Sequence, residues 1–167
     1  MPEPKHNRGK SNQSYATPKE FIQAVKRGLG GIEFAYDLAA TAKNTQAAKW
    51  WSPEQDSLKQ AWDAKGWNWL NPPYGHITPW VEKAFTDSLK YDTSIAMLIP
   101  ASVGSNWWRN YVHMEARVWL LNRRIQFVGA PTVSPKDHAL LIYAPWLESG
   151  YHIWDWAQEH VYLAEPH

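Results

Sequence analysis

Three helix-start signals of one kind divide the chain and limit the folds open to it. Each is a Ser or Thr followed by Pro, at residues 17–18, 52–53 and 78–79. Proline is favoured at the first position of a helix, and in the first two signals a Glu or Gln three residues after the Ser or Thr completes a capping box. Apolar residues at helical spacing follow each signal. We therefore expect three helices here, and a fourth beginning at Ser105 or Asn106.

Short apolar runs of strand length lie between these helices. They cover residues 32–38, 67–70, 94–99, 117–121 and 138–143. Strands that alternate with helices indicate an α/β fold with a mostly parallel, Rossmann-like sheet and helices on both faces. The last two runs are joined by residues 129–137, which carry no helix signal, so we expect an antiparallel pair at one edge. Residues 151–163 are expected to form a final short helix.

Composition bounds the organisation and the chemistry. A length of 167 residues corresponds to about one domain of ordinary size, which we place at 15–167 after a flexible arm at 1–14. The arm is either a solubilising tail or a contact to a phosphate backbone. The chain has no cysteine, which excludes disulfides, thiolate zinc sites and cysteine nucleophiles. No His pair has ligand spacing, so no metal is expected. The absence of a signal sequence or a long apolar span favours a cytoplasmic protein.

Charge and tryptophan content give two further limits. Seventeen Lys and Arg against sixteen Asp and Glu leave a net charge of +1, far from the excess of a protein that holds nucleic acid by charge alone. The chain also carries twelve tryptophans. Most are expected in the core, and a few exposed ones could stack on a base.

The sequence Asn71-Pro72-Pro73-Tyr74 directly follows the central strand at 67–70. Ligands of parallel α/β sheets bind beyond the carboxyl ends of the strands. The two prolines remove two N–H donors and leave a rigid stretch that presents carbonyl acceptors. Asn71 adds a side-chain oxygen, and Tyr74 adds an aromatic face. The alternative is an ordinary strand-ending turn, since Asn-Pro and Pro-Pro are common in loops.

Such a group of acceptors suits a planar ring that bears an exocyclic amine. The N6 lone pair of adenine is delocalised into the ring, which makes the amine a poor nucleophile. If the Asn71 side-chain oxygen and the Pro72 carbonyl each accept one N–H, the lone pair is freed to attack an electrophilic methyl group. The same fixed dipoles stabilise the charge that develops on nitrogen, and Tyr74 stacks on the ring. We therefore take Asn71, Pro72, Pro73 and Tyr74 as the catalytic candidates.

This motif resembles that of the amino-methyltransferases that use S-adenosylmethionine, which reads Asn or Asp, Pro, Pro, aromatic. Over residues 15–145 the flanking sequence is similar to the compact, Dam-like DNA N6-adenine methyltransferases of phages and prophages. The segments that carry this resemblance are Thr17-Pro18 with Phe21, Asp37–Ala40, Asp56–Leu58 with Trp62, Trp80–Ala84, Leu98–Ala101 and Arg124–Phe127. In one departure from the larger superfamily, no glycine-rich turn follows the first strand at residues 37–41.

The resemblance implies a set of cofactor-binding residues. Asp37 would hold the ammonium of S-adenosylmethionine, and its alternative role is to cap or terminate a loop. Thr17 and Pro18 would line the pocket for the methionine part, although their capping box already explains them. Asp56 would accept the amine of the cofactor's adenine, or else serve as an acid in the first turn of a helix.

The resemblance also implies a DNA partner, in double-stranded form, whose target adenine is flipped out of the helix. The candidates for gripping DNA near the pocket are Trp107, Trp108, Arg109, Arg123, Arg124 and Lys136, although core packing or surface charge is the better explanation for any one of them. The loop at 129–137 and the N-terminal arm are left to recognise the site. Two alternatives remain open: a glutamine-amide or RNA-adenine methyltransferase, and a tryptophan-rich nucleic-acid-binding module without catalysis.

Overall fold

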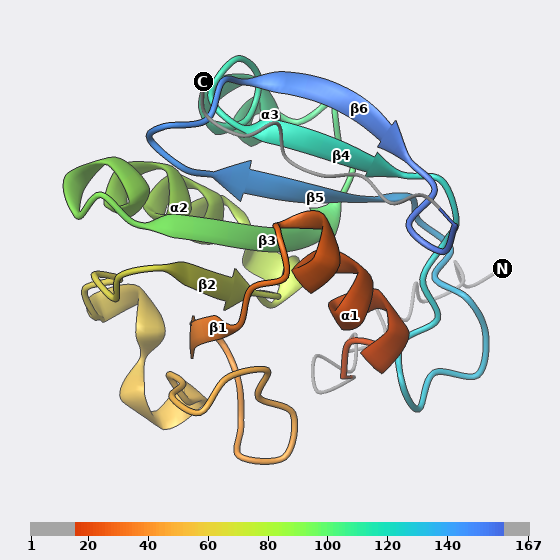
Figure 1. Ribbon diagram of the computed structural model, residues 1–167, viewed down its shortest axis with the longest axis horizontal. Helices are drawn as coiled ribbons and strands as arrows, with labels where there is room; N and C mark the ends of the chain where they lie inside the picture. Colours follow the sequence, from red (N-terminus) through yellow and green to blue (C-terminus); the bar gives the residue numbers. More distant parts are fainter. Residues whose placement is uncertain (1–15, 159–167) are drawn as a thin grey trace, which may run out of the picture.

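The computed structural model describes residues 16–158, and its centre is one six-stranded sheet in the order β1-β2-β3-β5-β4-β6 (Figure 1). The strands are β1 Phe34–Asp37, β2 Trp67–Leu70, β3 Ser94–Pro100, β4 Arg117–Leu121, β5 His138–Tyr143 and β6 Gly150–Trp154. The pairs β1–β2, β2–β3 and β4–β6 are parallel, and β5 runs antiparallel to both β3 and β4. The α/β class and the mostly parallel sheet with an antiparallel pair are confirmed.

Helices cover both faces of this sheet. The α-helices are α1 Lys19–Gly28, α2 Thr78–Lys90 and α3 Asn106–Tyr111, and the short 3-10 helices are η1 Pro53–Gln55, η2 Ser57–Lys59 and η3 Tyr74–His76. The apolar side of α1 packs on one face, and α2 and α3 pack on the other. Strand β3 contributes side chains to the core on both faces of the sheet, because alternate side chains of a strand point to opposite faces. Ile95, Met97 and Ile99 face α2 and α3, whereas Ala96 and Leu98 face α1.

The antiparallel strand lies in the interior of the sheet, so the prediction of an antiparallel pair at one edge is wrong. Strand β5 is inserted between β3 and β4, and β6 pairs outside β4. The prediction of a helix over 151–163 is also wrong where it can be compared, because 150–154 form β6 and residues 159–163 lie outside the described part. The aromatic and β-branched side chains of 151–154 favour a strand. Trp154 anchors it, with its ring centroid 4.8 Å from that of Trp119.

No α-helix forms after Ser52, contrary to the expected helix over 52–66. The start signal itself works, since the side-chain oxygen of Gln55 accepts the Ser52 N–H at 2.9 Å. The turn ends at once because Asp56 adopts a left-handed backbone with φ of 50°. Trp62 is buried without a helix, and its indole N–H donates to the Ser57 carbonyl at 3.1 Å. The link from β1 to β2 is therefore an irregular segment that packs beside the end of β1.

The tryptophans follow the expectation of a mainly structural role. Five of the twelve are buried and six are half-buried, which leaves Trp146, 48% exposed, as the exception. Within residues 16–158, no helix has the length and apolar character that crossing a bilayer requires. The expected arm at 1–14 lies outside the described residues.

Candidate active site

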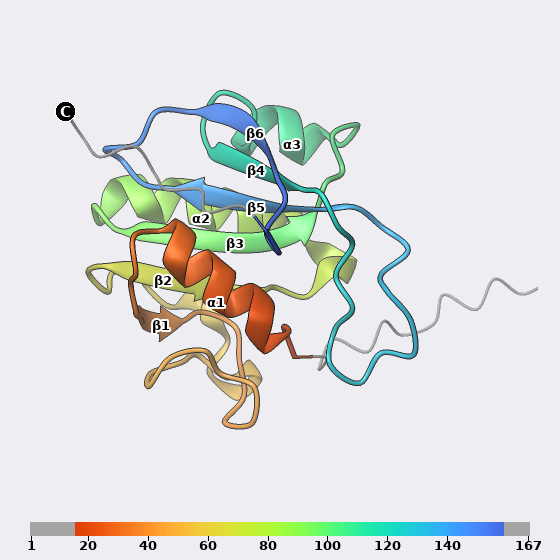
Figure 2. The same ribbon diagram turned by 45° about the vertical axis from the view of Figure 1, so that its right-hand side comes forward.

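The carboxyl ends of three parallel strands and the start of β5 meet at one end of the sheet. Asp37 ends β1, Asn71 follows β2, and Pro100 at the end of β3 pairs with His138 at the start of β5. The segment 122–137, which links β4 to β5, projects beyond the same end (Figure 2). This is where ligands of open α/β sheets bind.

The Asn71 amide is held by a hydrogen bond at each end. Its nitrogen donates to the Thr17 hydroxyl at 3.1 Å, and its oxygen accepts from the Tyr74 hydroxyl at 2.7 Å. The Tyr74 hydroxyl also lies 3.3 Å from the Leu98 carbonyl. Burial raises the pKa of Tyr74 far above its usual value, so this hydroxyl keeps its proton. A carbonyl-type oxygen has two lone pairs, and the Asn71 oxygen can therefore accept one more hydrogen bond.

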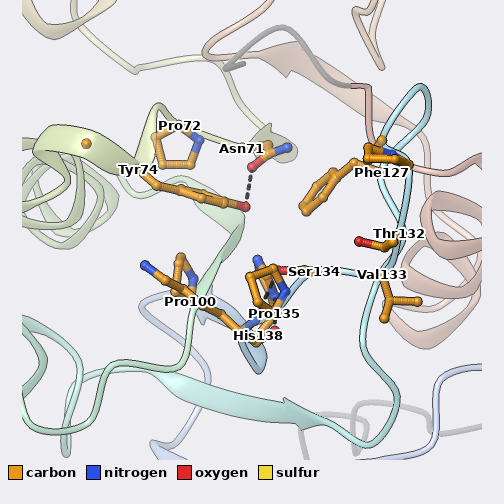
Figure 3. Close-up of a pocket in the computed structure, with 14 residues that line it drawn as sticks. Asn71, Pro72, Tyr74, Pro100, Phe127, Thr132, Val133, Ser134, Pro135 and His138 are labelled. Carbon is orange, nitrogen blue, oxygen red and sulfur yellow. Dashed lines mark hydrogen bonds between the residues drawn. The ribbon is translucent and has the colours of Figure 1, made fainter. Parts of the chain in front are cut away.

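A cavity of about 430 Å³ opens beside this amide (Figure 3). Asn71, Pro72 and Tyr74 form one wall, and Phe127 with residues 130–136 forms the other. In Figure 3 the Phe127 ring lies across the cavity from the Asn71–Tyr74 pair, and Thr132 and Val133 lie on the far side. Gly75, Pro100 and His138 complete the lining. Walls of proline and aromatic rings with a few polar atoms suit a flat, largely apolar ring.

His138 is the buried titratable group of this cavity. Its Nδ1 lies 3.1 Å from the Lys136 carbonyl, so this nitrogen carries the proton, and Nε2 has no hydrogen-bond partner among the described residues. Burial lowers the pKa of His138 to about 4, which keeps the ring neutral near pH 7. The ring packs between Tyr74 and Phe127, with centroid distances of 5.7 and 5.6 Å.

A second, much smaller cavity of about 30 Å³ lies on the other side of Asn71. Its lining is largely polar and consists of Ala16, Thr17, Asp37, Ala39, Asn44, Gln46, Trp69 and Asn71. Asp37 is only 2% exposed, and its carboxylate accepts the N–H of Gln46 at 2.9 Å and of Ala39 at 3.2 Å. Burial outweighs these two bonds and raises the pKa of Asp37 to about 7.

Asn71 is the one residue that lines both cavities in the described part of the chain. Its amide therefore stands between an apolar cavity large enough for a ring and a buried carboxylate. In its ionised form, Asp37 has the right charge to receive a ligand's ammonium group. The cavity beside it, which Asn44 and Gln46 also line, has room for only a water molecule or two, so it must widen to admit a larger group.

A third, open hollow is formed by residues of the segment 36–55, and we call it the outer hollow. Tyr36, Thr41, Ala42, Lys49, Trp50, Ser52, Glu54 and Gln55 line it. Asp56, expected at the cofactor, is exposed and lines none of the three cavities. Its carboxylate lies 3.4 Å from the ammonium of Lys59.

Thr17 does not have the helix-capping role that the sequence pattern predicts. No side chain caps α1, whose N-cap residue is Pro18, so the predicted capping box at Thr17 is wrong. The hydroxyl instead bonds to Asn71, 54 residues further along the chain. Pro73 is exposed and lines neither cavity. Its extended backbone begins the η3 turn, which brings Tyr74 back toward Asn71.

The three candidate DNA contacts on α3 do not line the large cavity. Trp108 is 3% exposed and donates its indole N–H to the Tyr151 hydroxyl at 3.2 Å, so it is a core residue and its suggested role in gripping DNA is wrong. Trp107 is half-buried against the same core, and Arg109 is exposed.

The three candidates on segment 122–137 lie nearer the site. Lys136 is exposed and lines the large cavity. Arg123 and Arg124 are exposed and form ion pairs with Asp155 at 3.0 Å and Asp137 at 3.1 Å. Sequence reasoning singled out the loop at 129–137 but missed Phe127 and His138 as lining residues. Their positions at the two ends of a proline-rich segment could have indicated that they line the same cavity as this loop.

Comparisons with known proteins show which family the chain resembles. The family model for DNA N-6-adenine-methyltransferase (Dam) matches residues 5–149. A DNA N-6-adenine-methyltransferase of Haemophilus phage HP1 is 28% identical over 135 residues, which is 80% of this chain and 77% of that protein. One of Escherichia phage T1 is 32% identical over 94 residues, which is 56% of this chain and only 38% of that protein. The match over most of its length shows that the chain belongs to the DNA N-6-adenine-methyltransferase (Dam) family.

Proposed function

We propose that this DNA N6-adenine methyltransferase takes its methyl group from S-adenosylmethionine and transfers it to an adenine flipped out of double-stranded DNA. The observation that carries the proposal is the position of Asn71 between the two cavities. An enzyme that transfers a group must hold the donor and the acceptor next to each other. Holding the two reactants at near-attack distance accounts for much of the rate enhancement.

The large cavity is the site for the acceptor base. The Asn71 oxygen and the Pro72 carbonyl accept the two hydrogens of the N6 amine, which leaves its lone pair directed at the donor. The bond from Tyr74 at 2.7 Å uses one lone pair of the Asn71 oxygen and leaves the other for the substrate. The Tyr74 ring stacks on the base. Because these groups are fixed before the substrate arrives, they stabilise the developing positive charge without reorganisation.

The small cavity is the site for the amino-acid end of the donor. S-adenosylmethionine supplies a methyl group made electrophilic by a sulfonium. The Asp37 carboxylate pairs with its ammonium, which is the partner that a buried carboxylate needs. Thr17 and Pro18 lie at the start of α1 on this side of the site. The outer hollow, with the aromatic rings of Tyr36 and Trp50, is a better placed receptor for the adenosine part than Asp56.

A base inside a duplex cannot reach the cavity walls, so the target nucleotide must leave the stack. Stacking and edge hydrogen bonds in the cavity then offset an unstacking cost of a few kcal/mol. Lys136 and the exposed part of segment 122–137 supply contacts to the DNA backbone. Because the substrate is DNA, we place the enzyme in the cytoplasm, and in that of the host if a phage encodes it.

The direct test measures transfer of labelled methyl groups to adenine-containing duplexes in the wild type and in Asn71→Ala. We expect N6-methyladenine with the wild type, and a loss of at least about a hundredfold in Asn71→Ala, as for other lost groups that stabilise transition-state charge. Asn110→Ala, an exposed position on α3, is the matched control. Equal turnover in both variants would remove Asn71 from the mechanism. Methylation of RNA or of a glutamine amide in preference to DNA, in a competition assay, would change the substrate class.

A further inference from the structure

Thr17 occupies a rigid position beside the proposed catalytic amide. The residue is 6% exposed and lies directly before α1, whose first turn is anchored by Phe21 and Ile22 in the core. On its other side, the Ala16 carbonyl accepts the Val128 N–H at 3.0 Å. The Thr17 backbone is thus held between α1 and a bridge from Ala16 to Val128, the residue after the cavity-lining Phe127.

The hydroxyl takes no part in building the helix. No side chain caps α1, and the Ile22 N–H donates to the Pro18 carbonyl at 3.1 Å. The bond between Thr17 and Asn71 therefore cannot be a by-product of helix capping. It ties the segment before α1 to the turn after β2.

The Asn71 amide lies with its nitrogen toward Thr17 and its oxygen toward Tyr74. The contact with Tyr74 is 2.7 Å, the usual length of an O–H···O bond, and the contact with Thr17 is 3.1 Å, within the range of an N–H···O bond. In this orientation the amide oxygen is available to the substrate amine. A reversed amide would present N–H groups to the N–H groups of the substrate.

On the basis of the proposed function, we propose that Thr17 is a positioning residue that acts through Asn71. Its hydroxyl accepts the amide N–H, and so holds the Asn71 oxygen where the N6 amine needs an acceptor. Without the hydroxyl, the half-buried amide nitrogen loses its partner, and the amide rotates to recover a hydrogen bond. Thr17 then governs the rate of transfer, whereas a residue that only binds the donor would govern its affinity.

The test compares Thr17→Val, which keeps the shape and removes the hydroxyl, with Thr17→Ser, which keeps the hydroxyl. For each variant we would measure the dissociation constant of S-adenosylmethionine by titration and the single-turnover rate with saturating donor and duplex. We expect Thr17→Val to slow the saturated rate about tenfold with little change in donor affinity. Thr17→Ser should stay near the wild type.

Two results would overturn the inference. One is a weaker donor affinity in Thr17→Val with a wild-type saturated rate, which would make Thr17 a donor ligand only. The other is an equal loss of rate in Thr17→Ser and Thr17→Val, which would show that the packing of the side chain matters and the hydroxyl does not. A lack of methylation by the wild type would instead count against the proposed function.

A readout without turnover keeps the inference testable even if a variant is unstable or inactive. The Asn71 side-chain NH₂ should give two distinct ¹H–¹⁵N NMR signals in the wild type and in Thr17→Ser, with slow hydrogen exchange. In Thr17→Val these signals should exchange faster, and Thr17→Ala provides a second variant without the hydroxyl. Unchanged exchange in both hydroxyl-free variants would contradict a bond from Asn71 to Thr17.

Discussion

Binding of the donor should depend steeply on pH because the carboxylate proposed to receive its ammonium is buried. Asp37 is 2% exposed, and burial raises the pKa of its carboxyl group from 3.8 to about 7 despite the two backbone N–H groups that it accepts. In the ligand-free protein this group is therefore largely protonated at pH 6. An ammonium binds the ionised form, so binding has to displace the proton.

The size of the effect follows from the ionised fraction. With a pKa of about 7, that fraction rises from about 0.09 at pH 6 to about 0.76 at pH 7.5, so the dissociation constant of S-adenosylmethionine should fall about eightfold. An aspartate with an ordinary pKa of about 3.9 is ionised throughout this range and would give no change. An α-amino group with a pKa of about 7.7–8.0 is about 0.6–0.75 charged at pH 7.5, which reduces the expected fall to about five- to sixfold.

Isothermal titration at pH 6.0, 6.5, 7.0 and 7.5 measures this dependence directly. Repeating the pH 6.0 titration in buffers of different ionisation enthalpy should show release of about 0.9 proton per donor bound. Asp37→Asn should bind more weakly and without this pH dependence, whereas Asp63→Asn at an exposed site should behave as the wild type. A flat affinity in the wild type, with no proton released, would refute either the raised pKa or the ion pair.

Three further predictions concern the walls of the large cavity. Burial lowers the pKa of His138 to about 4, against about 6.5 in the unfolded chain. The folded protein therefore keeps its full stability above pH 6.5 and loses free energy of unfolding as the pH falls, about 2 kcal/mol by pH 5. The raised pKa of Asp37 changes the free energy of unfolding in the opposite sense over the same range. The contribution of His138 is therefore measured as the difference in free energy of unfolding between wild type and His138→Gln, from urea unfolding at pH 8 and at pH 5. An equal difference at the two pH values would contradict the prediction. Tyr74→Phe keeps the stacking ring and loses the bond to Asn71, so single-turnover rates should fall about two- to tenfold with unchanged DNA affinity. Lys136→Ala should weaken DNA binding at every sequence and lower the slope of log affinity against log salt by about one in fluorescence anisotropy, whereas an unchanged slope would show that Lys136 contacts no phosphate.

The sequence predicted the parts of the fold where a local pattern alone determines the structure and no tertiary contact overrides it. The run at 94–99 has no polar alternation because β3 is buried on both faces, and its strand was predicted within one residue. The segment at 151–163 shows the opposite case. Its apolar residues match a helical period, but 150–154 pair with β4 and bury Trp154 beside Trp119. Pairing with a distant strand decided the structure, and no local pattern reports such a partner.

The candidate site shows the same limit at single residues. The Asn-Pro-Pro-Tyr turn could be proposed as the site from the sequence because its chemistry is contained in four adjacent residues. The contact of Thr17 with Asn71 was not predicted, because the sequence around Thr17 forms a complete capping signal and does not show which N–H the hydroxyl accepts. The fold places Asn71 within 3.1 Å of it, and that contact replaces the cap. A capping signal that the structure leaves unused therefore indicates that the side chain has a tertiary partner, and in this chain the partner is the proposed catalytic amide.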